Sequence, residues 1–269
     1  MRRMLWLILP LLVALPAAGH SPVPVVATSA VLADLTQAVG GDRVTVTTLI
    51  PAGFCPAHYD LRPSDLLAVA RAELILYHGF EPWLEGLLAN VNPDAQAQQL
   101  AGGWNTPAPL IAKAETIRDV LAEIAPQWAE EFSDRAEEFA DRVRELGEQI
   151  LTRAGQLGLG QVPAVVMAWQ ADFATWLGLK VAITYPPEEN LSLKDLAELV
   201  DAGRAAQAAL VVDNLQSGVS FGSRLAHELG AVHVVLTNFP GALPGARDVL
   251  AMLRVNADAV FSAVAAVGD

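Results

Sequence analysis

The chain has a single cysteine, Cys55, which is followed three positions later by a histidine, His58. Both side chains can offer lone pairs to a soft or borderline metal ion. They lie between a strand predicted over residues 43–50 and a helix that begins at residues 63–65, where α/β proteins commonly bind ligands. The pattern therefore predicts a metal-binding loop. The alternative interpretations are a small buried cysteine and a histidine that only hydrogen-bonds within the loop.

The motifs that would turn this loop into an active site are missing. Gly40 and Gly41 end a helix and lead into a strand, which is the reverse of a phosphate-binding loop. No Gly-x-Ser-x-Gly elbow occurs. The spacing of Cys55 and His58 on a proline-containing loop does not orient a base on a thiolate, and no third group orients the histidine. The sequence predicts binding rather than catalysis.

Apolar runs and amphipathic segments alternate along both halves of the chain, which predicts parallel sheets with crossover helices. The first half has predicted strands at 24–28, 43–50 and 73–77, and predicted helices at 31–39, 66–71 and 82–91. The second half has predicted strands at 164–168, 180–184, 209–213 and 233–237, and predicted helices at 172–177, 193–202, 221–229 and 247–267. The fold class is therefore α/β, with two Rossmann-like lobes.

A helical segment separates these halves. Thr106 and Pro107 are typical of a helix start, and Pro126 ends that helix. From 127 to 157, apolar residues recur every three or four positions, which predicts a helix roughly 45 Å long. A rigid connector along both lobes explains its central position; a coiled-coil partner helix is the alternative. We expect a signal peptide at 1–19, an N-terminal lobe at 20–105, a helical segment at 106–158 and a C-terminal lobe at 159–269.

The first residues indicate export. A basic start, an apolar run at 5–15 and small residues up to Gly19 are typical of a cleavable signal peptide, with an uncleaved membrane anchor as the alternative. Cleavage after Gly19 would remove Arg2 and Arg3 and make the formal charge of −13 about −15. An acidic surface of this kind disfavours nucleic acid and anionic membranes as partners. We expect a periplasmic, soluble monomer.

Several short segments, in this order, resemble the metal-ion solute-binding proteins of ABC importers, the zinc and manganese class. They cover nearly the whole mature chain and comprise Val25-Val26-Ala27-Thr28, Pro63-Ser64-Asp65, Glu81-Pro82-Trp83-Leu84, Gly178-Leu179, and Leu225 to Ala231. The resemblance implies two lobes joined by one long helix, with a metal ion held between the lobes and handed to a membrane permease.

The ligands that the resemblance implies, usually histidines and a carboxylate, are not found at the matching positions. Those positions fall on Ala57, Gly102, Met167 and Asn238, and His58 is displaced from the first by one residue. The histidine-rich acidic loop of some zinc members is also missing. The sequence therefore departs from the family at the site itself.

Two explanations remain open. In the first, a different donor set binds the metal: Cys55, His58, His78, Met167 and Asn238, the last three at strand ends. Such a set favours Zn²⁺, with copper or manganese as alternatives. In the second, the same fold binds a chelated metal or a non-metal small molecule, and His78 has only a turn role.

Overall fold

The structure is a computed structural model that describes residues 21–267, and its strands form two parallel four-stranded sheets. The N-terminal lobe has the strand order β2-β1-β3-β4 and the C-terminal lobe has the equivalent order β6-β5-β7-β8. The strands are β1 (Val23–Ala27), β2 (Val44–Thr48), β3 (Leu74–Tyr77), β4 (Gln96–Gln99), β5 (Pro163–Met167), β6 (Lys180–Tyr185), β7 (Leu210–Asn214) and β8 (Val232–Leu236). The predicted α/β class with two lobes is confirmed. The predicted signal peptide lies outside the described residues.

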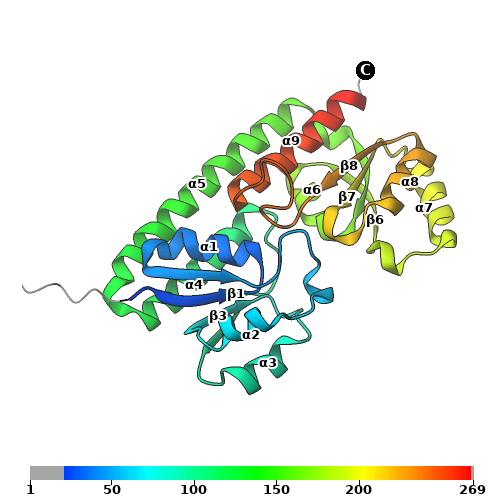
Figure 1. Ribbon diagram of the computed structural model, residues 1–269. Coiled ribbons are helices and arrows are strands. Elements are labelled where there is room, and N and C mark those ends of the chain that lie inside the picture. Colours follow the sequence, from blue (N-terminus) through cyan, green and yellow to red (C-terminus); the bar gives the residue numbers. More distant parts are fainter. Residues whose placement is uncertain (1–20, 268–269) are drawn as a thin grey trace, which may run out of the picture.

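Helices cover both faces of each sheet (Figure 1). They are α1 (Ala30–Gly40), α2 (Pro63–Val69), α3 (Leu84–Val91), α4 (Pro107–Ile124), α5 (Ala129–Gln156), α6 (Ala171–Leu177), α7 (Leu193–Ala205), α8 (Ser220–Leu229) and α9 (Val249–Val267). Their starts follow local chemistry: the Ser29 side chain caps α1, and Ser192 and Asp195 form a capping box on α7. The helices α2 and α4 begin with proline at their first position.

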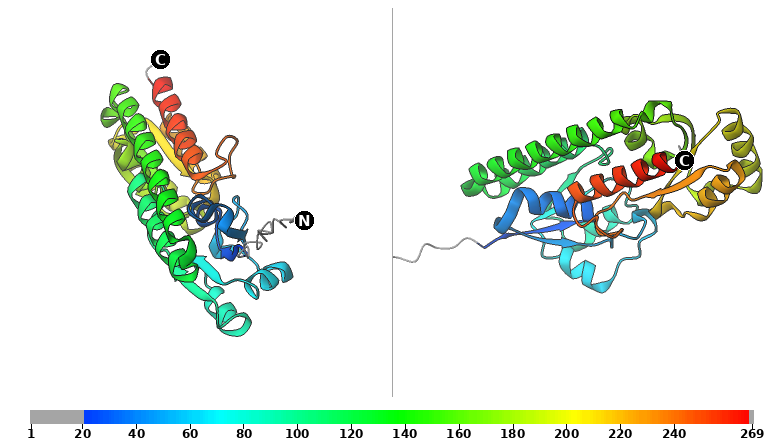
Figure 2. Two further views of the ribbon diagram at one scale, coloured as in Figure 1. Left: turned by 90° about the vertical axis from the view of Figure 1, so that its left-hand side faces the viewer. Right: turned by 90° about the horizontal axis from the view of Figure 1, so that it is seen from above.

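The connector helix α5 has 28 residues, which corresponds to about 42 Å. It contacts α1 and α4 of the N-terminal side and α6 and α9 of the C-terminal lobe. Figure 2 shows α5 running along the length of the molecule beside α9. Its buried residues, among them Phe132, Phe139 and Val143, belong to one apolar cluster that also contains strand residues of both sheets. The predicted long connector helix is confirmed, and its apolar face is covered by the chain itself.

The strand β4 is the one described strand that the sequence did not predict. Its residues, Gln96 to Gln99, have no apolar run, and β-branched side chains are absent from it. It forms because it pairs in parallel with β3, from Leu74↔Gln96 to Tyr77↔Gln99. Its position at the edge of the sheet also permits a polar sequence.

A half-buried carboxylate joins the two lobes on the connector side. The Asp34 carboxylate on α1 accepts a hydrogen bond of 2.8 Å from the backbone N–H of Val249, the first residue of α9. Burial raises the pKa of Asp34 from 3.8 to about 6; the hydrogen bond and Arg142 oppose this rise, and Asp248 adds to it. A pocket of about 290 Å³ lies beside this contact and is lined by residues of both lobes, including Arg247.

This raised pKa predicts a pH effect of defined sign. The folded state binds the proton more tightly than the unfolded state, so the contribution of Asp34 to stability is complete below pH 3.8 and is lost as pH rises to about 6. Between pH 4 and pH 7, we expect the free energy of unfolding of Asp34→Asn to rise by up to about 3 kcal/mol relative to that of the wild type. Denaturant unfolding at several pH values measures this difference. The exposed Asp94→Asn is the control, and a pH-independent difference for Asp34→Asn would contradict the assignment.

Candidate functional site

The loop with Cys55 and His58 lies where the N-terminal lobe meets the C-terminal lobe. Residues Pro56–His58 form a short 3-10 turn, in which the His58 N–H donates to the Cys55 carbonyl at 3.1 Å. The Cys55 side chain is half-buried and His58 is exposed. At the start of the same loop, the Ala52 carbonyl accepts a hydrogen bond of 3.1 Å from Gln216 of the opposite lobe. The predicted loop therefore adjoins the interlobe contact.

A carboxylate of the other lobe approaches His58. His58 Nε2 lies 4.0 Å from Oε1 of Glu189, which belongs to the short turn Glu188–Asn190 after β6. The two side chains are 62% and 53% exposed, so an ion pair between them contributes little to stability. The geometry instead matters for binding, because imidazole nitrogen and carboxylate oxygen both ligate zinc. The sequence analysis did not identify Glu189, since contact across lobes has no local signal.

His78 is buried behind this surface, directly after β3. Its Nε2 lies 2.8 Å from the Ser29 hydroxyl, and its ring stacks on Phe80 at 5.1 Å and lies 4.2 Å from the Trp104 ring, measured between centroids. Burial lowers the pKa of His78 from 6.5 to about 4; Glu81 and the Leu100 carbonyl oppose this shift, and Lys113 supports it. The imidazole is therefore neutral at pH 7.

Acid should destabilise the folded protein through this buried imidazole. A lowered pKa means that the contribution of His78 to stability is complete above pH 6.5 and is lost as pH falls to about 4. Over that pH range, we expect the free energy of unfolding of the wild type to fall by up to about 3 kcal/mol because of this group. His78→Asn should lack this decrease. Denaturant unfolding from pH 7 to pH 4 tests this, with the exposed His227→Asn as control; an unchanged pH slope in His78→Asn would refute it. Asp34 changes stability in the opposite direction over an overlapping pH range. Both Asp34→Asn and His78→Asn are therefore needed to separate the two contributions.

The nearby carboxylate, Glu81, is fully engaged by the protein. It accepts hydrogen bonds from the Thr28 hydroxyl at 2.5 Å and from the backbone N–H groups of His78 and Gly79 at 3.0 and 2.8 Å. These bonds fix the turn after β3 and use both carboxylate oxygens. Glu81 therefore holds the turn that positions His78, and we assign it no part in metal ligation.

Asn238, directly after Thr237 at the end of the last strand region, is the centre of a carboxamide network. Its Oδ1 accepts hydrogen bonds of 2.7 Å from both Asn105 and Gln170, and its backbone carbonyl accepts one of 2.6 Å from the Trp104 indole N–H. Its backbone N–H donates to Gln216 at 3.2 Å. We call these residues, Asn105, Gln170, Gln216 and Asn238, the amide network. It joins the two lobes without a charged group of its own.

Two oxygen atoms of the amide network are buried without a hydrogen-bond donor. They are Oδ1 of Asn105 and Oε1 of Gln170, and the side chains of these residues are 8% and 0% exposed. Buried acceptors without a donor are uncommon and destabilising unless a water molecule or a ligand satisfies them. The network therefore has capacity for donors from outside the protein.

Met167 ends β5 and is fully buried. Its thioether sulfur accepts a hydrogen bond of 3.2 Å from the backbone N–H of Trp169, and the Ser217 hydroxyl lies 3.9 Å from it. Through these contacts the sulfur meets the residues that follow β5 and β7. Met167 therefore supports the strand end that carries Trp169 and Gln170.

The structure groups the five predicted donors into separate environments. Cys55 and His58 share one loop, the His78 ring and the Asn238 carbonyl both contact Trp104, and Met167 is packed inside the C-terminal lobe. Within residues 21–267, no group of three or more His, Cys, Asp and Glu side chains is placed to hold a metal ion. Asn105, Gln216 and Glu189 complete the interlobe region and were not among the predicted donors.

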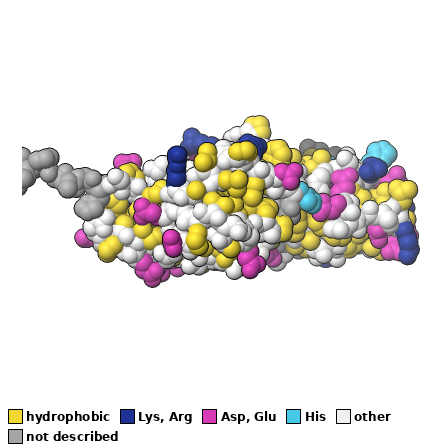
Figure 3. Space-filling view, turned by 60° about the horizontal axis from the view of Figure 1, so that its bottom comes forward, with side chains coloured by type: hydrophobic (Ala, Val, Ile, Leu, Met, Phe, Trp, Pro, Cys, Tyr) yellow, Lys and Arg dark blue, Asp and Glu magenta, His cyan; other side chains and the backbone are white. Residues whose placement is uncertain are grey.

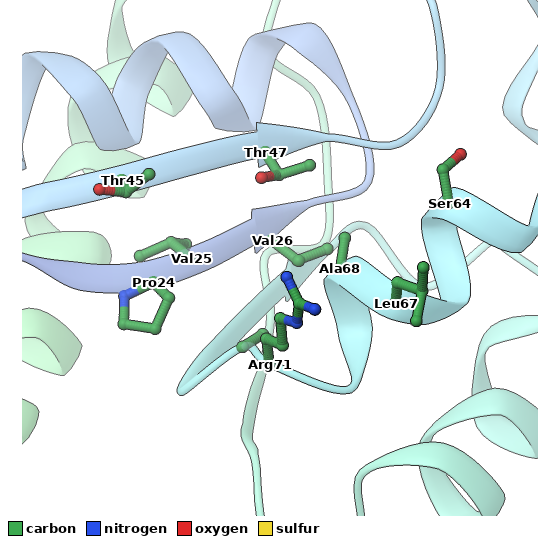
Figure 4. A pocket seen from close by; sticks show the side chains of 10 residues that line it. Pro24, Val25, Val26, Thr45, Thr47, Ser64, Leu67, Ala68 and Arg71 are labelled. Carbon is green, nitrogen blue, oxygen red and sulfur yellow. The ribbon is translucent and has the colours of Figure 1, made fainter.

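A separate pocket of about 330 Å³ lies on the outer side of the N-terminal sheet (Figure 4). Thr45 and Thr47 of β2 and Val26 of β1 line it, and Leu67 and Arg71 come from α2 and the turn that follows. None of the five predicted donors lines this pocket. Figure 3 shows hydrophobic side chains gathered over the middle of one face of the molecule, between scattered acidic groups.

Comparison with known proteins identifies related sequences. Residues 25–263 match the family described as ZnuA, zinc-uptake complex component A, periplasmic. The metal ABC transporter substrate-binding lipoprotein SsaB of Streptococcus sanguinis is 31% identical over 84 residues, which are 29% of this chain and 27% of that protein. The manganese ABC transporter substrate-binding lipoprotein PsaA of Streptococcus pneumoniae is 32% identical over 74 residues, 25% of this chain and 24% of that protein. The matched segments thus span about a quarter of each relative.

Solved structures show the same fold over almost the whole chain. A crystal structure of ZnuA superposes with a TM-score of 0.76 at 24% identity and covers 90% of this chain and 99% of that one. The metal-free S38A mutant of a periplasmic metal-binding protein from Candidatus Liberibacter asiaticus gives a TM-score of 0.79 at 19% identity, covering 89% and 98%. At these identities the likeness establishes the fold.

Proposed function

Because the chain belongs to the ZnuA family of periplasmic zinc-uptake components, we propose that it is the extracytoplasmic receptor of an ABC importer and captures a transition-metal ion as cargo. The family match confirms the resemblance identified from the sequence. It also confirms that the chain is a binding component of transport rather than an enzyme. The cargo, the binding residues and the cognate permease are parts of the proposal.

We place the metal at the mouth between the lobes, with Cys55 and His58 as donors from one lobe and Glu189 as donor from the other. These three side chains do not form a metal-holding group in the described structure, so the proposal requires them to converge when the ion binds. The observation that carries this placement is the approach of His58 to Glu189 at 4.0 Å, in a loop that also holds the only cysteine. A thiolate, an imidazole and a carboxylate suit Zn²⁺ better than Mn²⁺, and the cation itself favours the thiolate. Met167 and Asn238 are engaged by the protein and support the surface behind this site. His78 pairs with the Ser29 hydroxyl through Nε2, whereas its buried Nδ1 forms no hydrogen bond in the described structure.

The family and the charge of the chain support the remaining parts of the proposal. A periplasmic location agrees with the predicted signal peptide and with the family description. The formal charge of −13 disfavours nucleic acid as a partner and attracts cations to the surface. The rigid connector α5 limits relative motion of the lobes, so selectivity should depend mainly on the donor types.

Titration calorimetry on the metal-stripped protein tests this proposal. We expect one Zn²⁺ to bind per chain, more tightly than Mn²⁺. Absence of binding for Zn²⁺, Mn²⁺ and copper, supplied free or chelated, by a protein with an unchanged unfolding transition would contradict a metal-receptor function.

The contribution of Glu189 gives a separate prediction. We expect Glu189→Gln to weaken Zn²⁺ binding about tenfold without a change in stability, because its side chain is half exposed and its ion pair with His58 is weak. Calorimetry measures the affinity. Glu198→Gln is the matched control, since Glu198 forms an exposed ion pair with Lys194 on α7. If the two variants bind Zn²⁺ with equal affinity, Glu189 is not part of the metal site.

A further inference from the structure

We infer that the metal reaches this receptor within a small organic chelator that carries a flat ring, and that the rings and carboxamides between the lobes bind this chelator. The inference rests on the proposed function and adds the chemical class of the cargo. It concerns groups between the lobes that have no role in the proposed metal ligation. These are a row of aromatic rings and the unsatisfied oxygens of the amide network.

The first argument is charge. The groups around Asn238 are carboxamides and the neutral imidazole of His78, and the carboxylate of Glu81 is used by three hydrogen bonds of the protein. The charged donors proposed for the metal, Cys55 and Glu189, belong to the loop before His58 and to the turn after β6. A bare divalent cation gains no counter-charge from the neutral groups. These groups therefore suit the organic part of a chelate whose metal stays with the charged donors.

The second argument is the number of donors. Zinc is usually four-coordinate, and within residues 21–267 the proposed donors Cys55, His58 and Glu189 do not by themselves form a group placed to hold it. The Cys55–His58 loop with Glu189 leaves coordination positions for donors from outside the protein. Amine and carboxylate groups of a chelator can occupy them. The protein then ligates the metal only in part and recognises the chelator for the rest.

The third argument is a row of rings that crosses the lobe boundary. Phe80 stacks on His78 at 5.1 Å between centroids, His78 lies 4.2 Å from Trp104, and Trp104 lies 5.6 Å from Phe239 of the other lobe. Phe80 is 43% exposed, and the nearby Trp169, whose carbonyl accepts from Asn105, is 44% exposed. Phe80 is the exposed ring at the end of this row, and an exposed ring can bind a further ring by offset stacking.

The fourth argument is the pair of buried oxygens on Asn105 and Gln170. Both side chains donate to the same atom, Oδ1 of Asn238, which leaves their own oxygens without donors. The N–H groups of an amino-acid-like chelator are donors of the required kind. These oxygens are closed to solvent, so we expect the lobes to separate slightly when the chelate binds. The ring row, the amide network and the Cys55 loop are linked through Asn238, Gln216 and Ala52.

The test compares cargo forms on the metal-stripped full chain by calorimetry and tryptophan fluorescence. The probes are Zn²⁺ alone, the zinc complex of histidine, the zinc complex of iminodiacetate, which has no ring, and histidine alone. We expect the zinc–histidine complex to bind at least tenfold more tightly than the other three. If free Zn²⁺ binds equally well or better, the inference fails and the proposed function stands; if no metal form binds, both fail. Equal affinity for the histidine and iminodiacetate complexes would refute the role of the rings.

A matched pair of variants at Phe80 isolates the ring. Phe80→Leu removes the exposed ring and keeps an apolar side chain, whereas Phe80→Tyr keeps the ring. We expect Phe80→Leu to weaken binding of the zinc–histidine complex at least tenfold and to leave the affinity for free Zn²⁺ unchanged. Phe80→Tyr should bind like wild type. An equal loss for both cargo forms, or for both variants, would overturn ring recognition.

Discussion

The double variant Cys55→Ser, His58→Ala should bind zinc about 1,000-fold more weakly than wild type, a loss of about 4 kcal/mol. A structural zinc site with four ligands contributes about 10–16 kcal/mol of binding free energy. Removal of two donors should therefore cost at least about 4 kcal/mol of that free energy. The fold should be unaffected, because His58 is exposed and Cys55 is only half-buried. Competition titration against a chromogenic zinc chelator measures the affinity.

The control for this variant is His227→Ala, which removes an exposed imidazole on α8. It should bind zinc like wild type. If the double variant retains the affinity and stoichiometry of wild type, the metal is held elsewhere in the chain. The role of the loop would then be limited to the interlobe contact at Ala52.

Replacement of Asn238 by alanine should lower the free energy of unfolding by about 2–4 kcal/mol. The change removes the acceptor for two buried N–H groups, on Asn105 and Gln170, and an unsatisfied buried donor costs about 1–3 kcal/mol. Asn105 retains a bond of 3.2 Å to the Trp169 carbonyl, so Gln170 should account for most of the loss. Denaturant unfolding measures the difference.

Asn90→Ala is the matched control, since its side chain makes an exposed hydrogen bond of 2.6 Å to the Gly86 carbonyl within α3. It should change stability by less than about 0.5 kcal/mol. Asn238→Ala should also increase hydrogen exchange at the interlobe residues, from Trp104 to Asn105. Equal stability of the two variants would mean that the amide network does not hold the lobes together.

The elements that depend on local pattern were predictable from the sequence. Apolar residues at three- and four-residue spacing predicted α5, and its buried side chains, such as Phe132 and Val143, follow that spacing. Proline at the first position of α4 marked its start, and the β-branched run of β2 was recognised as a strand. These signals are local because each helix or strand carries its own periodicity. In contrast, β4 depends on pairing with β3 and could not be read from Gln96 to Gln99.

The candidate site was predictable only in part, because its residues meet across lobes. Cys55 and His58 could be found by residue type and spacing, and the structure places their loop at the interlobe contact. Glu189 is more than 130 positions from His58, and no periodicity relates them. The role of Asn238 as an acceptor for two amides likewise depends on the packing of Asn105 and Gln170. These contacts are set by tertiary structure alone.

The central claim is that this chain carries a transition metal, and elemental analysis of the protein purified from its native host tests it most directly. Plasma mass spectrometry should find about one zinc per chain, and mass spectrometry of the intact protein under native conditions should show whether a small organic molecule is bound with it. Folded protein that retains no transition metal above the level of a non-binding control protein would contradict the account.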